Sequence, residues 1–240
     1  MHYISILSTL VTFAFAVAVF ARYRRRKGTH LLLWGIGLVF YGLGTLSEAI
    51  TLVTFNEYAM KIWYLCGAML TAAWLGQGTV YLLVRRRGVA NSLTVILLFV
   101  SLLAAYLVLT APINVAAAAA YDMNAPLSEQ YKDILVRSGP ITFLTIILNI
   151  YGTLTLVGGA LYSAYIFWRK RVLADRMIGN ILIAAGALMP AMGGTLIGAG
   201  LVDFLYLSEF LGVVLMYAGF VKATSQRPVD SKAAVHAPAG

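Results

Sequence analysis

Two acidic residues stand inside long apolar stretches of the chain, where a charged side chain is costly. Glu48 lies about six residues from one end of the stretch 31–54, and Glu209 lies about five residues into the stretch 204–221. At about 1.5 Å per helical residue, both carboxyl groups lie roughly 8 Å from the same end of their helices. A charged group facing lipid costs at least about 2.5–3.5 kcal/mol, so acids at this depth usually face the protein interior or a cavity. The two glutamates therefore define a candidate ligand-binding site.

Other side chains can complete this site if the apolar stretches surround one space. Lys61 begins the stretch 58–84 at the same level and is the predicted counter-ion of the two carboxylates. The rest of the predicted ligand-binding set consists of aromatic and amide residues on the same or adjoining stretches: Tyr41, Tyr206, Trp74, Gln77 and Asn149. In the structural alternative, each glutamate hydrogen-bonds a tyrosine or threonine across helices, or extends to the outer water, and no ligand binds.

Residues that could support catalysis or metal binding are scarce. The three histidines, His2, His30 and His236, all lie outside the apolar stretches, which argues against haem ligation, an intramembrane zinc site and a serine–histidine pair. Cys66 is the single cysteine, so a disulfide and a CxxC metal site are excluded. Asp203 lies at the end of a stretch, so the pair of aspartates that intramembrane proteolysis needs is missing. We expect no catalytic residues, no metal and no enzymatic activity.

Cofactor binding is not expected either. A retinal protein needs a lysine midway along its last helix, but the middle of the stretch 204–221 reads Gly212, Val213, Val214, and Lys222 lies at its end. The chain also has no glycine-rich phosphate loop ending in lysine. No cofactor is therefore predicted.

The composition indicates what positions these residues. Of 240 residues, 61% are hydrophobic and 11% are charged, with a mean hydropathy of +0.85. In soluble domains about 45–50% of residues are apolar and about 25% are charged. This excludes a cytosolic enzyme, a disordered chain and a disulfide scaffold. Seven stretches have the ~20 apolar residues that a membrane-spanning helix needs. We predict an all-α, seven-transmembrane-helix bundle in a single domain, 1–222, followed by a disordered tail, 223–240, with spans at about 3–21, 31–54, 58–84, 91–111, 140–168, 177–201 and 204–221.

The basic residues predict the orientation of this bundle. Fifteen of the eighteen lie in segments 22–27, 85–87, 169–176 and 222–232, on one side of the seven spans, against Lys61, Lys132 and Arg137 on the other. Basic connections stay on the cytoplasmic side, so the N-terminus is expected outside and the C-terminus inside. Topology and the lipid bilayer account for the net charge of +9, and no nucleic-acid partner is expected. The predicted location is the plasma membrane, or the inner membrane in a bacterium.

Glycine spacing predicts which spans pack closely. Gly179, Gly186, Gly193 and Gly200 recur every seven residues in span six, and span two repeats this spacing from Gly35 to Gly42 and from Gly37 to Gly44. Small residues let membrane helices approach closely, within one chain or across a dimer. Pro190 lies near the middle of span six, where it forms either a static kink or a hinge.

The one long connection, 112–139, contains an amphipathic pattern. Leu127, Tyr131, Ile134 and Leu135 share one helical face, with charged residues opposite. We expect a short helix on the outer surface.

These observations favour a non-enzymatic, receptor-like membrane protein that binds a small molecule, an ion or a proton in the outer half of its bundle. The short tail holds no effector domain, so signalling requires a cytoplasmic partner protein. Two alternatives remain: a proton-coupled or cation secondary transporter, or an accessory structural subunit of a membrane complex.

Overall fold

The computed structural model describes residues 2–84, 86–123, 125–171, 174–197 and 203–224, of which 2–3, 191–197 and 203–205 are described for their backbone alone. Helices account for nearly all of this part of the chain, and it contains no strand beyond an isolated bridge between Ile113 and Leu135. The elements are α1 (His2–Arg26), α2 (Thr29–Thr51), α3 (Glu57–Ile62), η1 (Trp63–Leu70), α4 (Thr71–Leu83), α5 (Arg87–Thr110), α6 (Val115–Ala119), α7 (Leu127–Ile134), α8 (Gly139–Thr153), η2 (Leu154–Gly158), α9 (Gly159–Arg169), α10 (Ala174–Ile197) and α11 (Asp203–Thr224).

Five helices within the described residues are long and apolar enough to cross a membrane: Ile4–Arg26, Thr29–Thr51, Arg87–Thr110, Gly139–Arg169 and Tyr206–Thr224. Their length and composition are compatible with a multi-pass membrane protein. The predicted stretch 58–84 is helical from 58 to 83 and is divided into α3, η1 and α4. The predicted stretch 177–201 is helical from 177 to 197, with side chains described only up to Pro190, and 198–201 lie outside the described residues. Helix α11 includes two residues of the predicted tail, and 225–240 lie outside the described residues.

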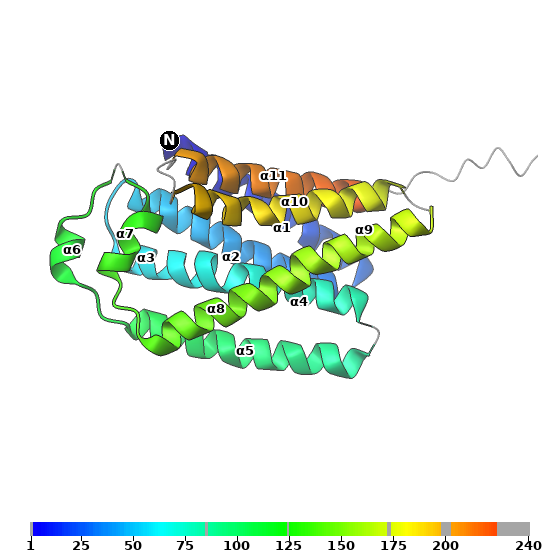
Figure 1. Ribbon diagram of the computed structural model, residues 1–240, viewed down its shortest axis with the longest axis horizontal. Coiled ribbons are helices and arrows are strands. Elements are labelled where there is room, and N and C mark those ends of the chain that lie inside the picture. Colours follow the sequence, from blue (N-terminus) through cyan, green and yellow to red (C-terminus); the bar gives the residue numbers. More distant parts are fainter. Residues whose placement is uncertain (1, 85, 124, 172–173, 198–202, 225–240) are drawn as a thin grey trace, which may run out of the picture.

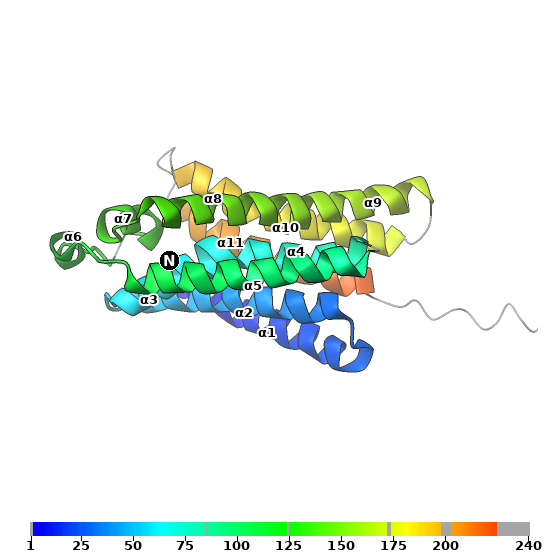
Figure 2. The same cartoon turned by 90° about the horizontal axis from the view of Figure 1, so that it is seen from below.

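The long helices lie side by side with their axes roughly aligned (Figures 1 and 2). Helix α2 lies between α1, which packs against one side of it, and η1 and α4, which pack against the other side. Its glycines make this possible: a Cβ on Gly42 would lie 2.9 Å from the Phe13 ring of α1, and one on Gly44 would lie 2.9 Å from the Cα of Gly67. The predicted close packing of span two is confirmed.

Helices α10 and α11 lie side by side (Figure 1) and share the most extensive contact of any two described elements. A Cβ on Gly186 would lie 2.5 Å from the carbonyl oxygen of Gly212, and one on Gly179 would lie 2.6 Å from that of Gly219. Two predicted glycine positions of span six thus serve contacts within the chain, while Gly193 and Gly200 lie outside the residues whose packing is described. Helix α10 continues through Pro190 to Ile197.

Two spans contain π-helical turns, which the sequence pattern does not predict. η1 has eight residues and η2 has five, and each continues into α-helix on both sides. Nearby side chains bond to carbonyl groups of the wider turn: Thr71 Oγ1 donates to the Cys66 carbonyl at 2.8 Å, and Asn149 Nδ2 donates to the Ala68 carbonyl at 2.7 Å. Such turns are rare and occur frequently at functional sites.

The connection between α5 and α8 forms a cap at one end of the bundle, which we define as residues 112–138. Helix α7 matches the predicted amphipathic helix, but its apolar face packs on protein: Leu127 and Ile134 are almost fully buried. The Tyr131 ring lies 5.3 Å from that of Trp63 and 5.4 Å from that of Tyr64. The cap therefore closes over the ends of α2, α3 and α5 at the left of Figure 1.

Candidate functional site

The structure brings Glu48 and Glu209 together. Glu48, in the last turn of α2, is completely buried, and Glu209 on α11 is partly buried. The two side chains lie within interaction range of each other. Their helices are joined beside the pair, because the Tyr41 hydroxyl of α2 donates to the backbone carbonyl of Glu209 at 3.0 Å. Two predicted site residues from opposite ends of the sequence thus share one place in the bundle.

Helix α1 is the third helix, after α2 and α11, that contributes residues beside the two glutamates. Thr9 Oγ1 donates to Thr45 Oγ1 of α2 at 3.0 Å and to the Ser5 carbonyl at 2.8 Å. This contact holds the first turns of α1 against the last turns of α2 and sets the Ser5 hydroxyl beside the Glu48 carboxyl group. Because Tyr41, Thr45 and Glu48 recur at helical spacing, the face of α2 that meets α1 and α11 also carries the acid.

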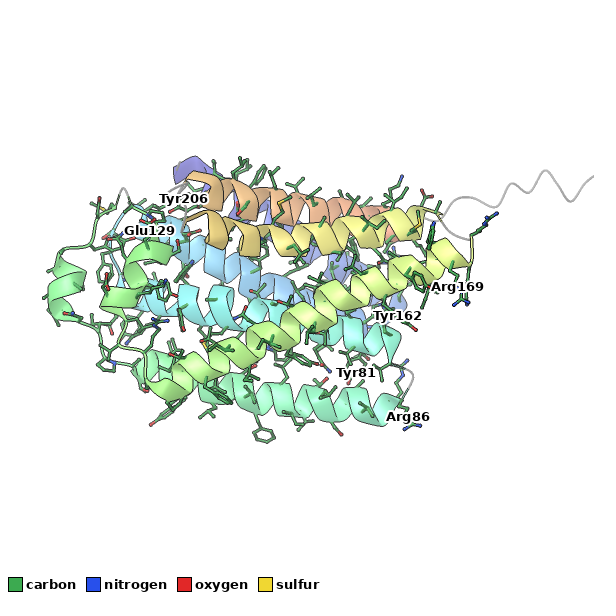
Figure 3. All side chains as sticks on the ribbon, viewed as in Figure 1. Tyr81, Arg86, Glu129, Tyr162, Arg169 and Tyr206 are labelled. Carbon is green, nitrogen blue, oxygen red and sulfur yellow. The ribbon has the colours of Figure 1, made fainter. Side chains whose placement is uncertain are left out.

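Two further tyrosines complete the site. Tyr206 begins the described part of α11 one turn before Glu209 and is buried, and it interacts with both carboxyl groups. Tyr121 comes from the cap and lies near Thr51 and Glu48. Burial raises the pKa of the Tyr121 phenol, and although its contact with Thr51 opposes this, the Glu48 charge adds to it. Figure 3 places Tyr206 at the same end of the bundle as Glu129 of the cap.

The buried polar atoms of this site are not satisfied by hydrogen bonds. Among the described residues, both oxygens of Glu48, the hydroxyl of Ser5, and the phenols of Tyr121 and Tyr206 have no partner at hydrogen-bonding geometry. More than nine in ten buried polar groups in proteins are paired, and a buried carboxylate without a partner is especially costly. Two carboxyl oxygens and three hydroxyl groups at this place are therefore available to bind a further group. We call these residues, with Glu209 and Tyr41, the carboxyl site.

Lys61, the predicted counter-ion, is engaged elsewhere. Its ammonium lies 2.5 Å from the Glu57 carboxylate, one turn earlier on the same helix, and donates to the Leu109 carbonyl at 3.2 Å. The groups that act most strongly on the Glu48 carboxyl are instead Glu209 and Ser5. The carboxyl site thus carries acids and hydroxyls without the predicted lysine.

The three remaining predicted ligand-binding residues lie away from the carboxyl site, in hydrogen bonds between helices. Trp74 Nε1 donates to Ser101 Oγ at 3.0 Å, and Gln77 Nε2 donates to the Ala90 carbonyl at 2.9 Å. Asn149 contacts the Ala68 carbonyl as described above. Gln77 also bonds Thr94 and accepts a hydrogen bond from Tyr151. These side chains join α4, α5 and α8, and we leave them out of the carboxyl site.

Sequence reasoning missed Ser5, Thr51 and Tyr121. Ser5 and Thr51 have a positional signal, since both lie near the same end of the bundle as the two glutamates. Tyr121 has none, because the cap brings it to Glu48 through a fold that no periodic pattern encodes.

The carboxyl site offers carboxylate, phenol and hydroxyl oxygens, which are the ligand atoms that hard cations prefer. Within the described ranges, no group of three or more His, Cys, Asp and Glu residues is arranged to hold a metal ion. Comparison of the chain with protein-family models, curated proteins and solved structures finds no match.

Proposed function

We propose that this chain is a seven-helix membrane sensor that binds a small cation or a proton at the carboxyl site and passes the change to a cytoplasmic partner. In this proposal residues 57–83 and α10 are two further crossings, spans three and six, which bring the total to seven, the N-terminus lies outside and the C-terminus inside. The basic residues support the orientation. Arg86 and Arg169 lie at the end of the bundle opposite to Glu129 and Tyr206 (Figure 3), and basic connections favour the cytoplasmic side.

One observation carries this proposal: the buried Glu48 carboxyl group lies beside that of Glu209, and Lys61 pairs with Glu57 instead of with either of them. Two carboxylates so placed repel each other, and the low dielectric constant of a buried site makes that repulsion strong. Binding a proton or a cation removes the repulsion. The occupied and empty states of the site therefore differ in how closely α2 and α11 approach.

A shift of α11 at the carboxyl site can reach the opposite end of the molecule through contacts between packed helices. Helix α11 carries Glu209 and contacts α10 through two glycine pairs, Gly186 with Gly212 and Gly179 with Gly219, so a shift of α11 moves α10 as well. Lys222, near the end of α11, pairs with Asp175 at the start of α10 at 3.3 Å. We propose Pro190 as the hinge that absorbs the shift, because a proline removes a backbone hydrogen bond within the helix.

The test follows the inner end of the bundle while the carboxyl site is titrated. Spin labels at Leu82→Cys and Val221→Cys, both on exposed side chains, report the distance between α4 and α11 in nanodiscs. We expect acidification to change this distance in the parent protein, and the change to vanish with Glu48→Gln or Glu209→Gln. Glu57→Gln is the matched control, because Glu57 pairs with Lys61 outside the carboxyl site. An unchanged distance under protons and added salts would overturn the sensor proposal.

The two alternatives give different results with the same variants. A transporter would show proton flux into vesicles that Glu209→Gln abolishes. An accessory subunit would copurify with a larger complex and tolerate both glutamine variants. The buried acids and the two π turns favour a transporter over an accessory role, so proton flux is measured first.

A further inference from the structure

We infer that the carboxyl site takes a single bare monovalent inorganic cation, such as Na⁺, in exchange with protons. This inference rests on the proposed function and specifies its ligand. It is carried by the unpartnered oxygens and by the tightness of the packing around them.

The donor set identifies the class of ligand. The atoms without partners are the two carboxylate oxygens of Glu48 and the hydroxyls of Ser5, Tyr121 and Tyr206, with the Glu209 carboxyl group beside them. All are oxygens, the ligand atoms that hard cations prefer, and nitrogen and sulfur ligands for transition metals are absent from this set. Glu48, Ser5 and Tyr206 are each at least 97% buried, so their oxygens face the interior of the protein.

The packing limits the size of the ligand. Glu48 has no exposed surface at all, and the Tyr41 ring and its bond to Glu209 hold α2 and α11 together beside it. An organic ammonium would have to displace helices to reach both acids. A dehydrated inorganic ion is the smallest ligand that these oxygens could share.

The charge of the site sets the valence. Two adjoining carboxyl groups that share one proton carry a single negative charge, which one monovalent cation neutralises. A divalent cation would bind two carboxylates, but such ions usually need more carboxylates or retained waters. The described neighbours add no positive charge: Ser5 comes from α1, Tyr41 from α2, Tyr206 from α11, Tyr121 from the cap, and Glu129 of α7 acts on Tyr206.

The first experiment measures the thermal stability of the full chain in micelles with NaCl, KCl or choline chloride at equal ionic strength. A ligand at 100 times its Kd stabilises the folded state enough to raise the Tm of a chain of this length by about 5–10 °C. We expect this rise with NaCl or KCl and none with choline chloride. Glu48→Gln and Glu209→Gln should remove the dependence on the cation, and Glu57→Gln should keep it.

A second measurement covers the case in which a glutamine variant does not fold. The ²³Na resonance of a NaCl solution should broaden when the parent protein is added, because Na⁺ binds, and should sharpen again on acidification, because protons displace the ion. Ser5→Ala, which removes one neutral donor, should weaken the broadening in a folded protein.

The outcomes separate the two proposals. A larger rise in Tm with Ca²⁺ or Mg²⁺, or an equal rise with choline, would overturn the monovalent-ion proposal. Absence of any cation effect, with an acid-dependent distance change at the inner end that needs both glutamates, would also overturn it and leave the sensor proposal standing. Failure of both the cation effect and the distance change would overturn both proposals.

Discussion

Replacing Gly152 by alanine tests the crossing of α4 and α8, which fixes the helices around the two π turns. Gly152 is buried, and a Cβ there would lie 2.6 Å from Ala72 Cβ and 2.6 Å from the Ala73 backbone nitrogen. Both contacts involve the α4 backbone or an atom bonded to it, so no flexible side chain can move away. Forcing a methyl group into such a contact costs about 1–3 kcal/mol.

The same span provides a matched control. Gly158 is exposed, and a Cβ there would meet nothing within 4 Å. Gly158→Ala should be neutral or stabilising by up to about 1 kcal/mol, because alanine is the better helix former. The two variants should differ by about 2 kcal/mol, which separates their melting temperatures by about 4–8 °C. Thermal unfolding in micelles, followed by circular dichroism, measures this difference. Equal melting temperatures would refute the close approach of α4 and α8.

Three other predictions concern the cap and the interhelical bonds. Leu127→Ala should destabilise the closed cap by about 2–5 kcal/mol, and hydrogen exchange in residues 112–138 should become faster. The exposed Leu103→Ala is the control and should leave this exchange unchanged; unchanged exchange in Leu127→Ala would contradict the prediction. Burial raises the pKa of Tyr121 and of Tyr131 above 10.0, partly opposed at Tyr131 by Arg137. The closed cap then holds more protons than the open cap, so its stability should fall as pH rises above 10.0; tyrosinate absorbance, compared in Tyr121→Phe and Tyr131→Phe, checks this. Gln77→Leu should cost about 0.6–2 kcal/mol and keep the cation dependence of Tm, whereas loss of that dependence would return Gln77 to the ligand set.

Hydropathy predicted the helical stretches well, because apolar length is written directly in the sequence. Span 58–84 and helical residues 57–83 differ by one position at each end, whereas the predicted 31–54 overruns α2, which ends at Thr51. The apolar residues after Thr51 belong to a turn that leads into α3. The π turns were not predicted, since they depend on contacts between spans rather than on periodicity.

The depth and helical face of Glu48 and Glu209 were enough to predict that they face the interior, and the structure places them together. Depth along the helix predicted Lys61 as their counter-ion, whereas the structure pairs this lysine with Glu57. Glu57 lies four residues before it, and an acid at that spacing on a helix is a ready partner. The ion pair between Lys61 and Glu57 therefore forms within one helix, and Lys61 does not reach the carboxyl site.

The π turns have a consequence for how this chain can vary. A π turn accommodates one extra residue within a helix, and an α-helix advances by about 100° per residue. Deleting one residue between Trp63 and Leu70 would let ordinary helix replace η1, and the helix before it and the helix after it would keep their orientation. The same deletion in an α-helical part of the chain would turn one side of the helix by about 100° relative to the other. Length variation at η1 would thus leave Lys61 close to the Leu109 carbonyl, whereas length variation elsewhere in the helix would rotate one face away from its partners.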